Sequence, residues 1–97
     1  HGYDPTWYRV EREDKAGIGY VDFIFYPEID RSAAGIILEL KVNHSPEEAI
    51  RQIKEKKYAL KFQGKTGEKP HYTGKILAVG IGYDKVSKMH RCKVEVL

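Results

Sequence analysis

The sequence holds a single cysteine, Cys92, among its 97 residues, so no disulfide can form within the chain. A chain without disulfides fits a reducing compartment, and we expect a cytoplasmic protein. No apolar run approaches the roughly 20 residues that a membrane-spanning helix needs, so we expect no membrane partner. Residues 1–5 lack the pattern of a secretory signal peptide and look like a tag remnant or an internal cut.

Repeats, low-complexity tracts and internal linkers are also lacking, which favours a single domain over residues 1–97. Hydrophobic residues make up 41% and charged residues 32%, as in a globular protein with one modest core. The net charge of +3 is too small to indicate a nucleic-acid partner by itself. Basic residues nevertheless concentrate in two segments, 54–69 and 85–93. Each segment is either a binding surface or a solvated face.

Alternating and β-branched segments predict five strands, and one amphipathic segment predicts a helix. The expected class is α/β (α+β-like), with a mixed central sheet and the order β-β-β-α-β-β. The first three strands can form a meander, and the strand–helix–strand step should make the two strands it joins parallel. The expected strands are Trp7–Glu13, Gly19–Tyr26, Gly35–Val42, Ile76–Tyr83 and Met89–Val96, of which Ile76–Tyr83 is nearly all apolar and should be buried on both faces.

The helix is expected over Pro46–Phe62 because its start carries strong signals. Ser45 suits the N-cap, Pro46 suits the first helical position and Glu48 completes a capping box. Four residues form the expected apolar face, namely Ala49, Ile50, Ile53 and Leu60.

Charged residues inside two apolar strands are the most informative feature of the chain. Alternation places Glu39 and Lys41 on one face of their strand, with Leu40 on the other. Asp22 lies in the strand Gly19–Tyr26, which is otherwise too apolar to favour a carboxylate. Burying such charges is costly, so their presence suggests a metal-dependent hydrolytic site.

The order of elements and these residues resemble the PD-(D/E)XK nuclease superfamily. Within it, the closest likeness is to the bacterial nuclease-like domains that follow an ATPase-like domain. The resemblance runs from Tyr8 to Tyr83 and implies a restriction-endonuclease-like core. Four segments carry it: Glu11-Arg12-Glu13, Gly17-Ile18-Gly19-Tyr20-Val21-Asp22, Ile36-Ile37-Leu38-Glu39-Leu40-Lys41 and Gln52-Ile53-Lys54-Glu55-Lys56-Lys57-Tyr58.

The resemblance implies a Mg²⁺-dependent or Mn²⁺-dependent nuclease, and the residue types agree with that chemistry. Asp22, Glu39 and the backbone carbonyl of Leu40 can supply the oxygen ligands that a hard cation prefers. Lys41 can orient the attacking water or stabilise developing charge. Gln52, on the second turn of the expected helix, can hold a water or a phosphate.

Each of these residues also has a plainer interpretation. Glu39 and Lys41 could form an exposed ion pair, and Asp22 could cap a turn or pair with Arg9 or Arg12. Gln52 could simply be solvated. Glu11 and Glu13 are expected to be surface charges, with an accessory metal ligand as the alternative for Glu11, and Tyr58 is expected in the core.

The expected partner is nucleic acid, with DNA preferred over RNA. The candidate phosphate contacts are the helical lysines Lys54, Lys56, Lys57 and Lys61. Two alternatives are a catalytically silent nucleic-acid-binding module and an assembly domain attached to an ATPase-like domain.

The superfamily core also opens with a helix, for which residues 1–6 are too few. We therefore expect a fragment of a longer protein, or a partner that supplies this helix. A sheet covered by one helix leaves an apolar face exposed, and we expect a homodimer that buries it.

Overall fold

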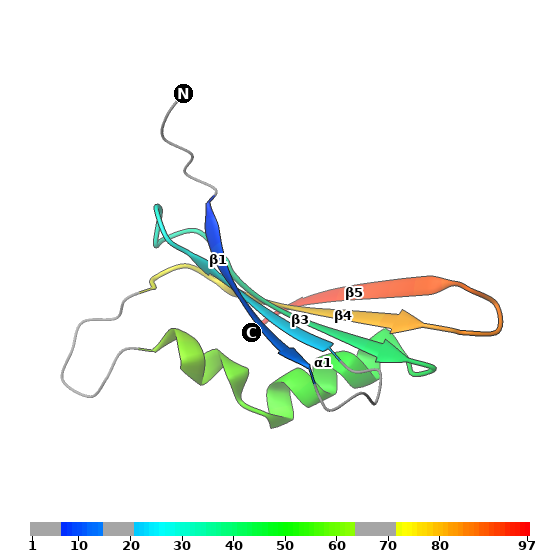
Figure 1. Cartoon of the computed structure of the whole chain (residues 1–97). Coiled ribbons are helices and arrows are strands. Elements are labelled where there is room, and N and C mark those ends of the chain that lie inside the picture. The colour runs from blue at the N-terminus through cyan, green and yellow to red at the C-terminus, as the bar shows by residue number, and fades with distance from the viewer. Residues whose placement is uncertain (1–6, 15–20, 64–71) are drawn as a thin grey trace.

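The computed structural model describes residues 7–14, 21–63 and 72–97. Five strands form one sheet: β1 (Tyr8–Asp14), β2 (Val21–Pro27), β3 (Gly35–Val42), β4 (Ile76–Tyr83) and β5 (His90–Val96). A helix, α1 (Pro46–Glu55), and a 3₁₀ helix, η1 (Tyr58–Phe62), follow β3 (Figure 1). The segment Gly17–Tyr20 of the nuclease-like motif lies outside the described residues.

The sheet is mixed and its strands lie in chain order, β1-β2-β3-β4-β5. Neighbouring strands are antiparallel except β3 and β4, which α1 connects in parallel. The expected fold class and strand order are therefore confirmed, and the architecture is consistent with a restriction-endonuclease-like core. No helix in the described ranges is long and apolar enough to cross a membrane.

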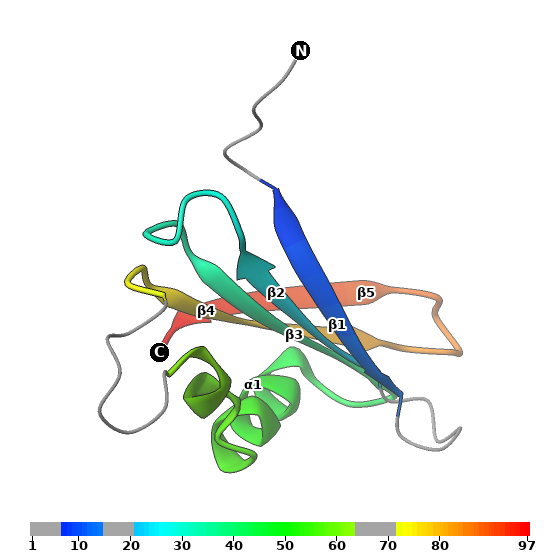
Figure 2. The ribbon, with the colours of Figure 1, turned by 60° about the vertical axis from the view of Figure 1, so that its left-hand side comes forward.

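The two helices lie together on one face of the sheet (Figure 2). Their apolar side chains and those of β2, β3 and β4 form a single buried core. Gly80 on β4 lets α1 approach closely, because a Cβ there would collide with the carbonyl oxygen of Pro46. The buried core consists of Ile24, Tyr26, Ile37, Ile50, Ile53, Tyr58, Phe62 and Ala78.

The expected helix over Pro46–Phe62 is wrong at its C-terminal end. α1 ends at Glu55, and Lys57 adopts a left-handed conformation with φ 55° and ψ 39° before the 3₁₀ turn begins. This break rotates the following residues. Leu60 therefore leaves the expected apolar face and is 54% exposed, while Tyr58 and Phe62 enter the core.

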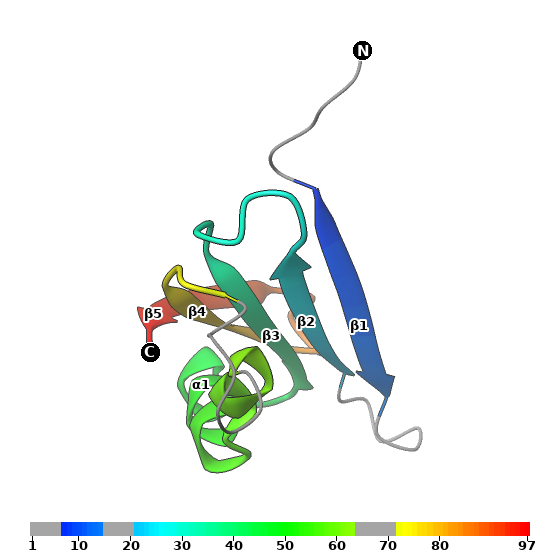
Figure 3. The same cartoon turned by 90° about the vertical axis from the view of Figure 1, so that its left-hand side faces the viewer.

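The expectation that β4 is buried on both faces is also wrong. Its residues alternate between buried and half-buried positions, because both described helices lie on one face of the sheet (Figure 3). The opposite face holds half-buried Phe23 and Phe25. At its two edges Val10 is 51% exposed and Val94 57% exposed. Among the described residues, nothing from α1 or η1 covers this face.

Candidate functional site

A row of residues across the sheet brings three acidic side chains together beneath the helices. Glu13 of β1 pairs with Asp22 of β2, and Asp22 pairs with Glu39 of β3. Directly paired residues project from the same face of a sheet. Asp22 and Glu39 are fully buried, with 0% of their surface exposed. Lys41, two residues beyond Glu39 on the same face, is 2% exposed.

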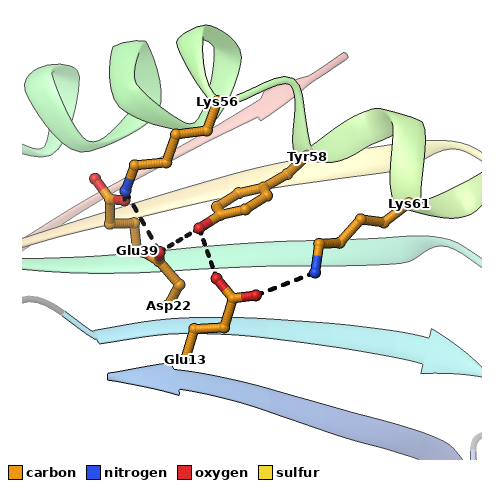
Figure 4. Close-up of polar contacts among 6 residues, drawn as sticks. All are labelled: Glu13, Asp22, Glu39, Lys56, Tyr58 and Lys61. Carbon is orange, nitrogen blue, oxygen red and sulfur yellow. Dashed lines mark hydrogen bonds and ion pairs between the residues drawn. The ribbon is translucent and has the colours of Figure 1, made fainter. Parts of the chain in front are cut away.

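The ammonium of Lys56 lies between the two buried carboxylates (Figure 4). Its Nζ atom lies 2.7 Å from Oε1 of Glu39 and 3.4 Å from Oδ2 of Asp22. The Lys56 side chain is 25% exposed, so the cation also remains in contact with solvent. Lys56 thus supplies positive charge where two carboxylates would otherwise repel each other.

The hydroxyl of Tyr58 joins the same cluster from η1. It lies 2.5 Å from Oδ2 of Asp22 and 3.0 Å from Oε2 of Glu13. A hydroxyl has one proton to donate, so Tyr58 donates a hydrogen bond to only one of these carboxylates at a time. Burial raises the pKa of Tyr58 well above its usual value, and the hydrogen bond to Asp22 raises this pKa further.

The left-handed turn at Lys57 makes this arrangement possible. On an uninterrupted α-helix, residues 56 and 58 would point about 200° apart, since each residue advances by about 100°. The positive φ at Lys57 breaks that relation. Lys56 and Tyr58 therefore both reach Asp22 from above the sheet (Figure 4).

Lys61 closes the outer side of the cluster. Its Nζ atom donates to Oε1 of Glu11 at 2.7 Å and to Oε1 of Glu13 at 3.1 Å. The hydrogen bond from Lys61 lowers the pKa of Glu13, and the bond from Tyr58 lowers that pKa further. Glu13 is therefore held in its ionised form beside Asp22.

Gln52 lies one helical turn before Lys56 and is half-buried. Its side chain makes no hydrogen bond with the other described residues, so a role for Gln52 stays a prediction. Leu40 is paired on both sides, with Val21 of β2 and Ile81 of β4. Strand carbonyls point toward neighbouring strands. The assignment of the Leu40 carbonyl as a metal ligand also stays a prediction.

Burial overturns one of the plainer interpretations. Glu39 and Lys41 are not an exposed ion pair, because both are buried. Nor is Arg9 directed to Asp22, since its Nε donates to Glu28 at 3.0 Å. The guanidinium of Arg12 stands over the ring of Phe23.

Three members of this cluster are hard to identify from the sequence, namely Glu13, Lys56 and Tyr58. Tyr58 lies in the core as expected, and its hydroxyl also reaches Asp22 and Glu13. Glu13, expected at the surface, is partly exposed, with its carboxylate beside Tyr58. Lys56 was expected to contact phosphate, yet its ammonium faces Asp22 and Glu39. Glu13 could be identified only from the register between β1 and β2, which places it opposite Asp22. Alternation within one strand does not provide that register.

The other helical lysines differ in their surroundings. Lys54 forms an ion pair with Glu95 of β5, and Lys61 binds Glu11 and Glu13. Lys57 is exposed. A phosphate contact by Lys54 or Lys61 would therefore compete with an existing carboxylate partner.

The raised pKa of Tyr58 predicts that the fold weakens in alkali. A tyrosine ionises near pH 10 in the unfolded chain, about where its ordinary pKa lies. Because folding keeps Tyr58 protonated, its contribution is complete below that pH and is lost as the pH rises toward the folded-state pKa. Denaturant unfolding between roughly pH 8 and 11 measures this loss.

We expect Tyr58→Phe to flatten the alkaline part of the stability curve. Tyr83→Phe, which removes a hydroxyl from β4 outside the cluster, is the matched control and should follow the wild-type curve. Lys61 also has a raised pKa, caused first by its hydrogen bond to Glu11, so a shallower decline in stability remains in Tyr58→Phe. Identical curves for the wild type and Tyr58→Phe would contradict the prediction.

The donor set fits a hard divalent cation in its chemistry. Asp22 and Glu39 are adjacent carboxylates on neighbouring strands, and Mg²⁺ is commonly bound through one or two carboxylates plus substrate phosphate. Within the described ranges there is no cluster of three or more His, Cys, Asp or Glu residues arranged to hold a metal. Such a site would therefore depend on oxygens from water or substrate to complete its ligands.

Comparison with known proteins identifies a family for this chain. A family model described as the PD-(D/E)XK nuclease superfamily matches residues 4–90. No curated protein and no solved structure matches the chain. The matched range includes the whole acidic cluster and both helices. The chain therefore belongs to the PD-(D/E)XK nuclease superfamily.

Proposed function

We propose that this domain hydrolyses phosphodiester bonds in DNA in a reaction that depends on Mg²⁺ or Mn²⁺. Membership of the superfamily indicates a nuclease-like function acting on nucleic acid. The observation that carries the finer proposal is the burial of Asp22 and Glu39 side by side, with Lys41 next along β3. Charges of this kind are costly to bury, so their presence in the interior supports a functional site.

In this proposal the residues have separate roles. Asp22 and Glu39 would hold the cation, which would supply activation of a water and neutralisation of charge on the phosphate. Lys41 orients the attacking water or stabilises the charge that develops on the phosphate. Tyr58 fixes the orientation of Asp22 through its hydrogen bond, as outer partners of metal ligands commonly do.

One observation favours the catalytically silent module as the second candidate. Lys56 already places a cation against both carboxylates, at 2.7 Å from Glu39 and 3.4 Å from Asp22. A permanent internal ion pair of this kind would stabilise the fold without a metal. The enzyme proposal requires that a divalent cation can displace the Lys56 ammonium.

A cleavage assay separates the two candidates. The purified protein is incubated with plasmid, linear duplex and single-stranded DNA, and with RNA, in Mg²⁺, in Mn²⁺ and in a chelator. We expect metal-dependent cleavage of DNA by the wild type and slower cleavage by Lys41→Ala, which should keep its metal affinity. DNA binding without cleavage in either metal would support the silent module.

The apolar face opposite the helices supports the proposed homodimer. Val10 is 51% exposed, Val94 57% and Val96 58%. Phe23 and Phe25 lie between these edges, with ring centroids 6.3 Å apart. We expect sedimentation at micromolar concentration to detect a dimer, and Phe25→Lys to dissociate it. A monomer at all concentrations would contradict this part of the proposal.

The remaining proposals concern the parent protein. The resemblance supports an ATPase-like domain beside this one, and an assembly role attached to such a domain is a further alternative. A single nuclease-like domain over residues 1–97 is the corresponding proposal for the domain boundaries.

A further inference from the structure

The β4–β5 hairpin carries cations that the acidic cluster does not use. Every residue from Asp84 to Val94 is exposed. Lys85 and Lys88 lie in the turn, and Arg91 and Lys93 lie on β5. Within the described part of the chain none of these four side chains forms an ion pair, unlike Lys54, Lys56 and Lys61 of the helical segment.

The carboxylates nearest the hairpin have other partners. Oδ1 of Asp84 accepts hydrogen bonds from the backbone N–H groups of Val86 and Ser87, at 2.8 and 3.1 Å. Glu95 is paired with Lys54 of α1. The positive charge of the hairpin is therefore available to a partner.

The hairpin is fixed in place relative to the acidic cluster. Asn43, just after β3, donates its N–H to the carbonyl of Tyr83 at 2.6 Å, and its Oδ1 accepts from the N–H of Lys85 at 3.0 Å. Lys41, Gly82 and Arg91 occupy one row across β3, β4 and β5. Neighbouring strands are about 4.8 Å apart, so the backbone of Arg91 lies about 10 Å from that of Lys41.

Arg91 also lines an open groove between the hairpin and the start of α1. The groove has a volume of about 700 Å³, and its other walls include His44, Gly82, Asp84 and Met89. Beyond it, the turn of the hairpin extends past the end of β3 (Figure 1). A two-stranded ribbon with a basic tip thus stands beside the strand that carries Glu39 and Lys41.

Edge strands often carry lysines simply to prevent pairing with another sheet. That explanation can apply to Lys93 on β5, which is an edge of the sheet. It does not account for Lys85 and Lys88, because both lie in the turn and not on the edge. Their positions suit a ligand at the tip of the ribbon.

We propose that the β4–β5 hairpin is the DNA-binding arm of this domain, inserting into the major groove of duplex DNA with Lys85, Lys88 and Arg91 against the phosphates. The major groove of B-form DNA, about 12 Å wide, admits a two-stranded ribbon. The major groove of A-form RNA is too narrow for one. This inference deepens the proposed function and rests on it, but it assigns DNA contact to the hairpin and not to the helical lysines.

Two triple variants with equal loss of charge test the assignment. The hairpin variant is Lys85→Gln, Lys88→Asn and Arg91→Gln. The matched helical variant is Arg51→Gln, Lys54→Gln and Lys57→Asn, which keeps Lys61 and its contacts with Glu11 and Glu13. Each contains one lysine with positive φ, 62° at Lys88 and 55° at Lys57, and asparagine tolerates that conformation well.

Binding is measured in a chelator, so that no cleavage occurs, by the fluorescence anisotropy of a labelled DNA duplex over a range of salt concentrations. Each lost phosphate contact should reduce the slope of log K against log salt by about 0.9. We expect the hairpin variant to bind at least tenfold more weakly with a slope reduced by about 2 to 3. The helical variant should stay close to the wild type, and an RNA duplex of the same sequence should bind more weakly than DNA.

Several results would overturn the assignment: no binding of duplex DNA by the wild type, a loss confined to the helical variant, or equal binding of RNA and DNA. If a triple variant fails to fold, the single change Lys85→Gln at the exposed turn should still reduce the slope by about 0.9. The proposed catalysis is tested separately by metal-dependent cleavage. If the wild type cleaves DNA but the hairpin variant binds DNA as tightly as the wild type, the DNA-binding arm alone is rejected. If binding depends on the hairpin but the wild type does not cleave DNA, the catalysis alone is rejected.

Discussion

Replacing Glu39 with glutamine is expected to abolish metal-dependent cleavage of DNA while the domain remains folded. The change keeps the size of a fully buried side chain and removes one of two adjacent negative charges. Changes to residues that only support metal ligands typically cost about 10- to 100-fold, so loss of a ligand should exceed about 100-fold. The measurement is the initial rate of plasmid cleavage in Mg²⁺ at matched protein concentration.

Asp22→Asn should behave in the same way, because Asp22 lies opposite Glu39 and shares the Lys56 ammonium. Glu55→Gln, at the exposed end of α1, is the control and should cleave like the wild type. Circular dichroism and denaturant unfolding establish that each variant is folded. Equal cleavage by the wild type and by both carboxylate variants would show that the activity comes from a contaminant.

Replacing Lys56 with methionine is expected to make the stability of the domain depend strongly on a divalent cation. The change removes the ammonium that lies 2.7 Å from Glu39 and 3.4 Å from Asp22, but keeps an unbranched side chain. Hydrogen bonds to charged groups contribute about 1.5–3 kcal/mol, so the metal-free variant should lose roughly 1–3 kcal/mol of unfolding free energy. Because the Lys56 side chain is 25% exposed, we expect the lower part of that range.

The same change should raise the affinity for Mg²⁺ by roughly tenfold, since the metal no longer has to displace an internal cation. Thermal unfolding across a Mg²⁺ titration measures both effects, because a ligand that binds only the folded state raises its apparent stability. Lys57→Met, at the adjacent exposed lysine, is the control. Equal stabilisation of the wild type and Lys56→Met by Mg²⁺ would show that Lys56 does not compete with the metal.

Alternation within one strand was sufficient to predict that Glu39 and Lys41 share a face, because side chains of a strand alternate with a period of two residues. Asp22 lies on the same face because it pairs directly with Glu39 across the two strands. Register between strands depends on turns and packing, so the position of Glu13 opposite Asp22 could not be derived in this way. Its contact with Tyr58 also depends on that register.

The end of α1 shows why local propensity was insufficient. The segment Glu55–Lys57 contains good helix formers and neither glycine nor proline, so nothing in it predicts a break. Packing determines where α1 ends. The ring of Phe62 packs against Gly35, where any side chain would collide with that ring, and the hydroxyl of Tyr58 reaches Asp22. The prediction that β4 is buried on both faces was wrong for a related reason, because its apolar residues do not reveal that the described helices cover only one face.

At Lys57, the left-handed residue between α1 and η1, the requirement on the backbone conformation is separate from any requirement on the side chain. Lys57 has a φ of 55°, and its side chain is exposed, so this position is constrained in its backbone but open in its chemistry. Glycine and asparagine accept that conformation, whereas a β-branched side chain resists it. Related sequences could therefore vary the charge at this position freely, while any change to valine or isoleucine would turn Lys56 and Tyr58 away from Asp22 together.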